Sequence, residues 1–151
     1  MNSNQLKQIM ESFSVTKKIF QGCYPIDKIP EVSTYRFPMA IIINLDPSFK
    51  SGSHWVSIFA LSPKKEVYYF DSMAVEPMGE IEKFLMNFPK ILQNNKAYQS
   101  PFSNVCGQYC LYFIFNIASG KTFKKFIQMM DKYRNPDVIV KKFVDKIINK
   151  L

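Results

Sequence analysis

The segment Ser103-Asn104-Val105-Cys106-Gly107-Gln108-Tyr109-Cys110-Leu111-Tyr112-Phe113-Ile114-Phe115 joins a polar loop to an apolar run. The run is longer than a typical buried strand, so we expect a buried helix that begins near Cys106. A helix N-terminus leaves backbone N–H groups unpaired and carries partial positive charge, and both favour a thiolate over a thiol. The pattern indicates either a nucleophilic cysteine or a buried core cysteine, which is common for this residue type.

Length and composition predict one well-packed domain over residues 1–151. Hydrophobic residues make up 47% of the 151 residues and aromatic residues 15%, which is typical of a globular core and excludes a disordered chain. The three cysteines follow no disulfide spacing, and the first residues lack the apolar core of a signal peptide. We therefore expect a reducing, intracellular setting and no membrane span.

Positive charge is concentrated near the C-terminus. The net charge is +8, and residues 121–150 hold nine basic side chains against three aspartates, so six of the eight net charges lie there. This distribution favours an acidic partner, while a solvated lysine-rich helix face would explain it equally well. The candidate nucleic-acid-binding residues are Lys124, Lys125, Lys141, Lys142 and Lys146.

Apolar spacing predicts helices over 3–13, 79–88, the segment from Cys106, 123–130 and the C-terminal end. Ser3 is the expected N-cap of the first helix. Asn135, Pro136 and Asp137 are expected at the N-cap, N1 and N2 positions of the last helix. The side chains expected to face inward on that helix are Val140, Phe143, Val144, Ile147 and Leu151.

The strands are predicted mainly in the first half of the chain. Residues 39–45 form a β-branched run between prolines, which is typical of a strand buried on both faces. Residues 54–61 and 66–72 flank the turn 62–65 and predict a β-hairpin, while 22–38 reads as a loop with at most a short strand. A short strand is also expected over 96–99, and the whole pattern predicts an α+β fold.

The hairpin register places two polar residues together. If Leu61 pairs with Glu66, Asp71 lies on the same face as His54 and diagonal to it, about 7 Å away between Cβ atoms. A slip of one residue would put them on opposite faces.

These residues supply the groups that acyl transfer requires. His54 is the only histidine, so it alone can accept the proton of Cys106 as an imidazole, and Asp71 would orient it. The side-chain amide of Gln99 and the Cys106 N–H would form an oxyanion hole, and Gly107 would let a substrate backbone come close. Each of these residues also has an ordinary structural explanation when it is taken alone.

A structural zinc site is the other chemical interpretation. Cys23, Cys106, Cys110 and His54 make a set of four ligand types, but their spacing matches no zinc motif. We therefore expect no metal.

The motifs together resemble a known clan of cysteine proteases. The order Ser53-His54-Trp55, Tyr69-Phe70-Asp71-Ser72, Gln99-Ser100-Pro101-Phe102-Ser103-Asn104 and Cys106-Gly107-Gln108-Tyr109-Cys110 is similar to the adenain and SUMO-protease clan, and most similar to adenain, the adenovirus maturation protease. The resemblance spans roughly residues 20–119 on a count of matching motifs. It also includes Gly22-Cys23-Tyr24 and Gly52.

The resemblance implies a papain-like cysteine protease fold in permuted order, with a small mixed or antiparallel sheet packed on a central helix and flanking helices. It implies that His54 is the base, Asp71 the orienting acid, Gln99 the oxyanion donor and Cys106 the nucleophile. It places Trp55 beside the site as a substrate-binding residue, with Gly107. Phe102 before Cys106 and Trp55 beside His54 suggest a narrow groove at the scissile bond.

Two features depart from adenain. Adenain carries Glu at the acid position, whereas Asp71 matches the SUMO-protease branch. Adenain also uses a cysteine between the acid and the Gln to bind a disulfide-linked peptide activator, and this chain has none between Asp71 and Gln99.

The expected function is that of a cysteine endopeptidase of a DNA virus or virus-like element that processes capsid or virion precursors after glycine-containing sites. The alternative is a deconjugating protease that removes a ubiquitin-like modifier after Gly-Gly, and a third hypothesis is a catalytically inactive binding module. We expect a monomer in the host nucleus or cytoplasm and in the virion, with no required cofactor. By resemblance, stimulation by DNA or by a peptide activator is expected.

Overall fold

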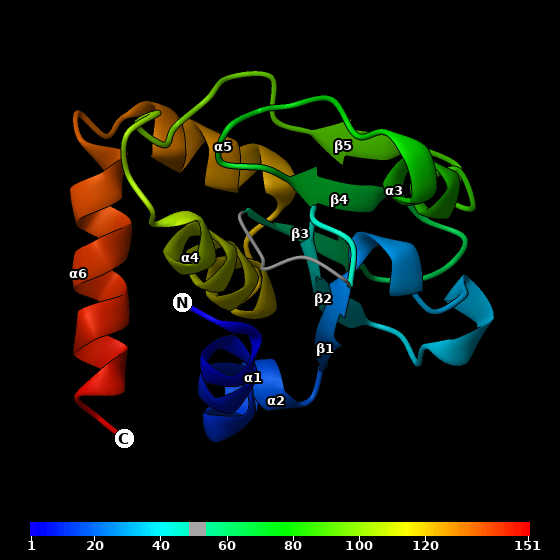
Figure 1. Ribbon diagram of the computed structural model, residues 1–151, viewed down its shortest axis with the longest axis horizontal. Coiled ribbons are helices and arrows are strands. Elements are labelled where there is room, and N and C mark those ends of the chain that lie inside the picture. The colour runs from blue at the N-terminus through cyan, green and yellow to red at the C-terminus, as the bar shows by residue number, and fades with distance from the viewer. Residues whose placement is uncertain (49–53) are drawn as a thin grey trace.

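The computed structural model describes residues 1–48 and 54–151 (Figure 1). Gly52 and Ser53 of the motifs above lie outside the described residues. The strands are β1 (Phe20–Pro25), β2 (Met39–Asn44), β3 (Trp55–Ala60), β4 (Val67–Phe70) and β5 (Ile91–Gln93). The helices are α1 (Ser3–Ser12), α2 (Ser14–Lys17), α3 (Gly79–Leu85), α4 (Cys106–Ala118), α5 (Phe123–Asp131) and α6 (Pro136–Ile148), with short 3₁₀ turns η1 (Ile26–Lys28) and η2 (Val32–Thr34).

One mixed sheet runs in the order β1-β2-β3-β4-β5. The β2–β3 and β3–β4 pairs are antiparallel, and the two outer pairs are parallel. Ser57 pairs with Phe70 and Ala60 with Val67, which confirms the predicted hairpin register.

Side chains alternate between the two faces of the sheet, as the pleat requires. On β2, Ala40 and Ile42 pack with α4 in the larger core, whereas Met39, Ile41 and Ile43 join the residues of α3 in the smaller one. Every residue of β2 is buried, because helices or turns cover both faces. Figure 1 shows α4 between the sheet and α6, with α3 on the opposite side. The predicted α+β class with a central helix is confirmed.

The central helix begins at the predicted residue, Cys106. It is buried on nearly all sides because α4 packs against β3, α6, α5 and the N-terminal helices. Phe70 at the end of β4 stacks on Phe113 of α4 at 5.1 Å and meets Phe126 of α5 edge-on at 5.2 Å. This aromatic cluster holds the end of β4, and therefore the next residue, Asp71, at a fixed position beside α4.

Three local predictions are wrong. The N-cap of α1 is Asn2 and not Ser3, because Ser3 is already the first residue of the helix. Asn2 forms a capping box with Gln5. The strand after α3 is β5 at Ile91–Gln93; residues 96–99 form no strand because the N–H groups of Tyr98 and Gln99 both donate to the Ser72 carbonyl. Leu151 lies beyond α6 and is 59% exposed, so it does not face inward.

The start of α6 agrees with the sequence. Asn135 is the N-cap and Pro136 occupies N1, as predicted, although the Asn135 side chain makes no capping hydrogen bond. Val140, Val144 and Ile147 are buried, and Phe143 is partly buried against Tyr112 and Phe115. No helix among the described residues is long and apolar enough to cross a membrane.

Candidate active site

Cys106 is the first residue of α4, and its side chain is 8% exposed. Burial opposes ionisation of the thiol, but hydrogen bonding to His54 and to the backbone N–H groups of Trp55 and Gly107, together with the nearby His54 charge, lowers its pKa below the ordinary value. The helix start adds unpaired N–H groups and partial positive charge. The site therefore favours a thiolate at Cys106.

His54 lies immediately before β3, and its Nε2 atom lies 2.6 Å from Oδ1 of Asp71. Burial lowers the pKa of the imidazole, but the hydrogen bonds to Asp71 and Cys106 and their charges outweigh burial and raise it to about 9. Because Nε2 is committed to Asp71, Nδ1 is the ring nitrogen left for the sulfur. A lowered cysteine pKa beside a raised histidine pKa describes a thiolate–imidazolium pair.

Asp71 is 1% exposed and is held by several partners. Besides His54, its carboxylate accepts hydrogen bonds from the N–H groups of Met73 at 2.8 Å and Val75 at 3.3 Å. The side chain of Asn94 accepts from the Asp71 N–H at 3.0 Å and donates to the Asp71 carbonyl at 2.6 Å. The acid is therefore fixed at both its carboxylate and its backbone.

Gln99 is 7% exposed and carries the side-chain amide proposed for the oxyanion hole. Ser72 Oγ donates to Gln99 Oε1 at 2.6 Å, and Gln99 Nε2 donates to the Ser103 carbonyl at 3.1 Å. These two bonds fix the amide orientation, and Nε2 retains a second N–H because a primary amide has two.

One cleft of about 470 Å³ joins these groups. His54, Gln99 and Cys106 line it, with Asp71 behind His54. The remaining lining residues are Met1, Trp55, Met73, Val75, Pro101, Ser103 and Asn104. The structure therefore brings all four predicted catalytic residues into one site.

The three residues expected near the substrate, Gly107, Phe102 and Trp55, have different surroundings. A Cβ at Gly107 would meet Met1 Cβ at 3.3 Å and Leu6 Cδ2 at 3.4 Å, so its small size serves the packing of the N-terminal helix on α4. Gly107 can face a bound substrate only through its backbone. Phe102 is 96% exposed and does not line the cleft, so it forms no wall of a narrow groove. Trp55 does line the cleft, and its Nε1 donates to the Met1 carbonyl at 3.1 Å.

The other two thiols lie in environments that suppress ionisation. Burial raises the pKa of Cys23 to about 12 and raises that of Cys110 well above its ordinary value. Within residues 1–48 and 54–151, no group of three His, Cys, Asp or Glu side chains is placed to hold a metal ion. Cys106 is thus the one thiol whose surroundings suit a nucleophile.

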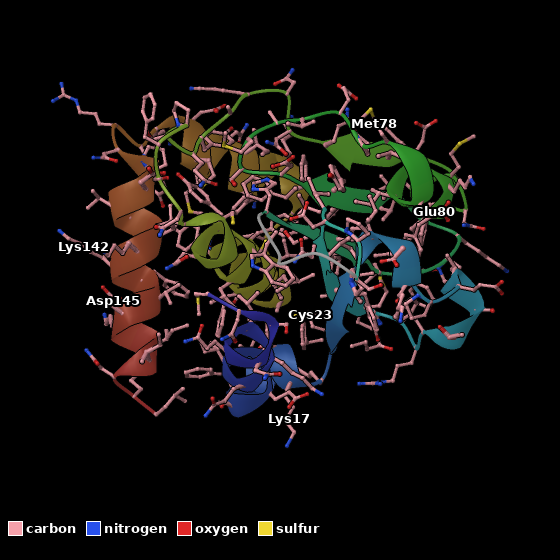
Figure 2. All side chains as sticks on the ribbon, viewed as in Figure 1. Lys17, Cys23, Met78, Glu80, Lys142 and Asp145 are labelled. Carbon is pink, nitrogen blue, oxygen red and sulfur yellow. The ribbon has the colours of Figure 1, made fainter. Side chains whose placement is uncertain are left out.

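The basic residues of the C-terminal part lie outside the catalytic cleft. All nine lysine and arginine side chains of residues 121–150 are exposed, whereas most apolar residues of α5 and α6 are buried or partly buried. None of them lines the catalytic cleft. Figure 2 shows Lys142 directed from α6 away from α4.

Sequence reasoning did not identify Ser72 and Asn94. Ser72 directly follows the predicted acid, Asp71, so its position in the sequence indicated that it lies near the site. Its bond to Gln99 could not be predicted, because the two residues are 27 positions apart. Asn94 lies in a polar segment after β5, and nothing in the sequence separates it from other loop asparagines.

The Cys106–His54–Asp71 arrangement supplies the groups that a thiol nucleophile needs, and one known protein with a similar sequence is named a protease. Over 93 residues the chain is 28% identical to a protein named "Protease" from Bovine adenovirus C serotype 10, with 52% of this chain and 47% of that protein covered. The chain thus spans about half the length of this curated relative. No protein-family model matches the sequence.

One solved structure supports the fold. ASFV pS273R protease matches with a TM-score of 0.66 at 17% identity, over 94% of this chain and 64% of that chain. SUMO protease Ulp1 matches with a TM-score of 0.47 at 16% identity, over 97% of this chain and 78% of that chain. The adenovirus relative confirms the predicted resemblance to adenain, and the ASFV structure confirms the predicted fold class.

Proposed function

We propose that this chain is a cysteine endopeptidase of a DNA virus or virus-like element, which processes capsid or virion precursors after glycine-containing sites. The observation that carries the proposal is the placement of Cys106, at the start of α4, in one cleft with His54, which Asp71 holds from behind. The adenovirus relative supports the viral part.

The geometry supports a two-step acyl transfer. The Cys106 thiolate attacks the carbonyl carbon of the scissile peptide bond, and the Gln99 amide and the Cys106 N–H receive the developing oxyanion. The His54 imidazolium then protonates the leaving amine as the C–N bond breaks. In the second step, neutral His54 takes a proton from water, which attacks the thioester and releases the acid.

The glycine preference rests on the resemblance. Trp55 lines the cleft together with His54. We expect replacement of the glycine to cost far more than the roughly 1–3 kcal/mol of one misplaced methylene, because approach of the substrate backbone itself would be blocked.

A diverse peptide library, sorted by cleavage site, tests this function. We expect wild-type protein to cleave after glycine, Cys106→Ala to be folded and inactive, and Cys23→Ala and Cys110→Ala to retain most activity, because their thiols are held protonated. Equal cleavage after Gly and Leu would refute the glycine preference. Hydrolysis confined to conjugates of a folded ubiquitin-like modifier would favour the deconjugating protease instead.

The proposal extends to partners and location. We propose that the chain acts as a monomer without a required cofactor, inside the host nucleus or cytoplasm and in the virion. The proposal includes non-specific contacts to DNA phosphates, made by Lys124, Lys125, Lys141, Lys142 and Lys146. DNA or a peptide activator would stimulate cleavage. The exposure of these lysines, away from the cleft, supports the DNA contacts.

A further inference from the structure

The two oxyanion donors belong to different segments. The Cys106 N–H is part of α4, whereas Gln99 lies on a loop whose next residues, Ser100, Pro101 and Phe102, are all exposed. An oxyanion hole works only when both donors lie about 2.7–3.1 Å from the developing charge. The loop that carries Gln99 must therefore be held at a fixed distance from α4.

Asp137 makes that connection. Its carboxylate oxygens accept a hydrogen bond from the Ser100 N–H at 3.3 and 3.4 Å, next to Gln99 in the chain. The Tyr109 hydroxyl lies 2.6 Å from Asp137 Oδ1 and 3.0 Å from the Tyr98 carbonyl, and shares its hydrogen between them. Tyr98 and Ser100 flank Gln99, so both neighbours of the amide donor are tied to the same pair.

Tyr109 links Asp137 to the helix that carries the nucleophile. It is 1% exposed and lies three residues after Cys106 on the same helix, so its hydroxyl moves with the nucleophile. Burial and the bond to Asp137 raise the pKa of Tyr109, which keeps it a donor. Asp137 itself lies in the first turn of α6, where the helix dipole favours a carboxylate.

We propose that Asp137 is a positioning residue whose carboxylate ties the Gln99 loop to the nucleophile helix and so fixes the spacing of the two oxyanion donors. The inference deepens the proposed function, because it rests on acyl transfer at Cys106. Asp137 contacts neither the sulfur nor the cleft and acts through Ser100 and Tyr109.

Two reagents separate positioning from thiol reactivity. With p-nitrophenyl acetate, the sulfur attacks the ester carbonyl, a tetrahedral oxyanion forms, the C–O bond breaks and p-nitrophenolate leaves. With iodoacetamide, the sulfur forms a bond to carbon as the C–I bond breaks, and no oxyanion forms. Acetylation of Cys106 therefore needs the donors in register, whereas alkylation needs only the thiolate.

We expect Asp137→Ala to slow Cys106 acetylation by about tenfold or more while alkylation changes by less than about twofold. Asp137→Asn keeps an oxygen acceptor, so its acetylation rate should fall by less. Tyr109→Phe, which removes only the hydroxyl, should repeat the selective loss. The matched control is Asp145→Ala, which removes the same charge from an exposed position on α6 (Figure 2) and should affect neither reaction. Exchange of the Ser100 amide hydrogen should accelerate in Asp137→Ala only.

The proposal is overturned if Cys106 is acetylated in Asp137→Ala and in Tyr109→Phe at the same rate as in Asp145→Ala. Parallel loss of acetylation and alkylation in the folded variants would also overturn it, because Asp137 would then support α4 as a whole. Failure of the proposed function is distinguishable: wild-type protein would react with both reagents and cleave no peptide.

Discussion

At the scale of single residues, the site works by opposing the effect of burial. Burial alone would raise the pKa of Cys106 and lower that of His54, which would leave both groups neutral. Their mutual interaction opposes both tendencies, together with the Asp71 carboxylate at His54 and the backbone N–H groups of Trp55 and Gly107 at Cys106. The reactive pair therefore exists only while all three side chains keep their geometry.

The pH dependence of cleavage follows from this balance. Because Asp71 helps raise the pKa of His54 to about 9, the imidazolium should persist at neutral pH, and kcat/KM should fall as the pH rises through about 9. Asp71→Asn removes the negative charge, so the alkaline limb should move toward the ordinary histidine value of 6.5. The loss at neutral pH should be smaller than in His54→Ala, because orientation of the imidazole is a supporting role. An unchanged alkaline limb in Asp71→Asn would contradict the assignment.

At the scale of elements, the site lies where secondary structures end. Trp55 opens β3 directly after His54, Phe70 closes β4 directly before Asp71, and Cys106 opens α4. Strand and helix ends place side chains and unpaired N–H groups in the same small volume, while the elements behind them stay rigid. Segments with no regular structure then have to be tied to these ends by side chains such as Asn94 and Ser72.

Asn94 gives a test at this scale. Asn94→Ala should destabilise the protein by about 1–3 kcal/mol, because it leaves the buried N–H and C=O of Asp71 without their partner. Peptide cleavage should fall as well, since Asp71 loses its backbone support. The measurement is urea unfolding with parallel kinetics. Asn87→Ala is the control, because the Asn87 amide also bonds to backbone carbonyls but lies exposed at the end of α3. Equal changes in the two variants would show that Asn94 has no special role.

At the scale of the whole molecule, catalysis and charge occupy different regions. The sheet separates two cores, with α4 on one side of it and α3 on the other (Figure 1). The cleft lies at the start of α4, next to the start of β3, and six of the eight net positive charges lie within residues 121–150. Exposed lysines are suited to binding the phosphate backbone of a nucleic acid independently of its base sequence. Binding and hydrolysis should therefore be separable by mutation.

Affinity for random-sequence duplex DNA tests this separation. It should fall steeply between about 50 and 200 mM salt, with a log–log slope of about 0.9 for each neutralised phosphate. Charge reversal at Lys141, Lys142 and Lys146 should flatten the slope and leave peptide cleavage without DNA unchanged. Reversal at Lys17, Lys18 and Lys28, on other elements, is the control for total charge. No binding by wild-type protein at low salt would leave the +8 charge as a solubility feature.

Features that depend on local periodicity could be predicted from the order of the residues. Apolar spacing, turn residues and capping residues predict the start of α4 at Cys106 and the first turn of α6. They also predict the hairpin register that puts His54 and Asp71 on the same face. Because a strand has a period of two, one correct register was enough to place the acid beside the base.

Contacts between distant segments could be known only from the folded protein. The bonds of Ser72 to Gln99 and of Asp137 to Ser100 join residues 27 and 37 positions apart, and no local pattern encodes such a pair. The same reason explains why Gly107 proved to be a packing contact for Met1 and Leu6 and why Phe102 turned to solvent. Local preferences fix where an element begins, but which surfaces meet depends on how all the elements fill one core.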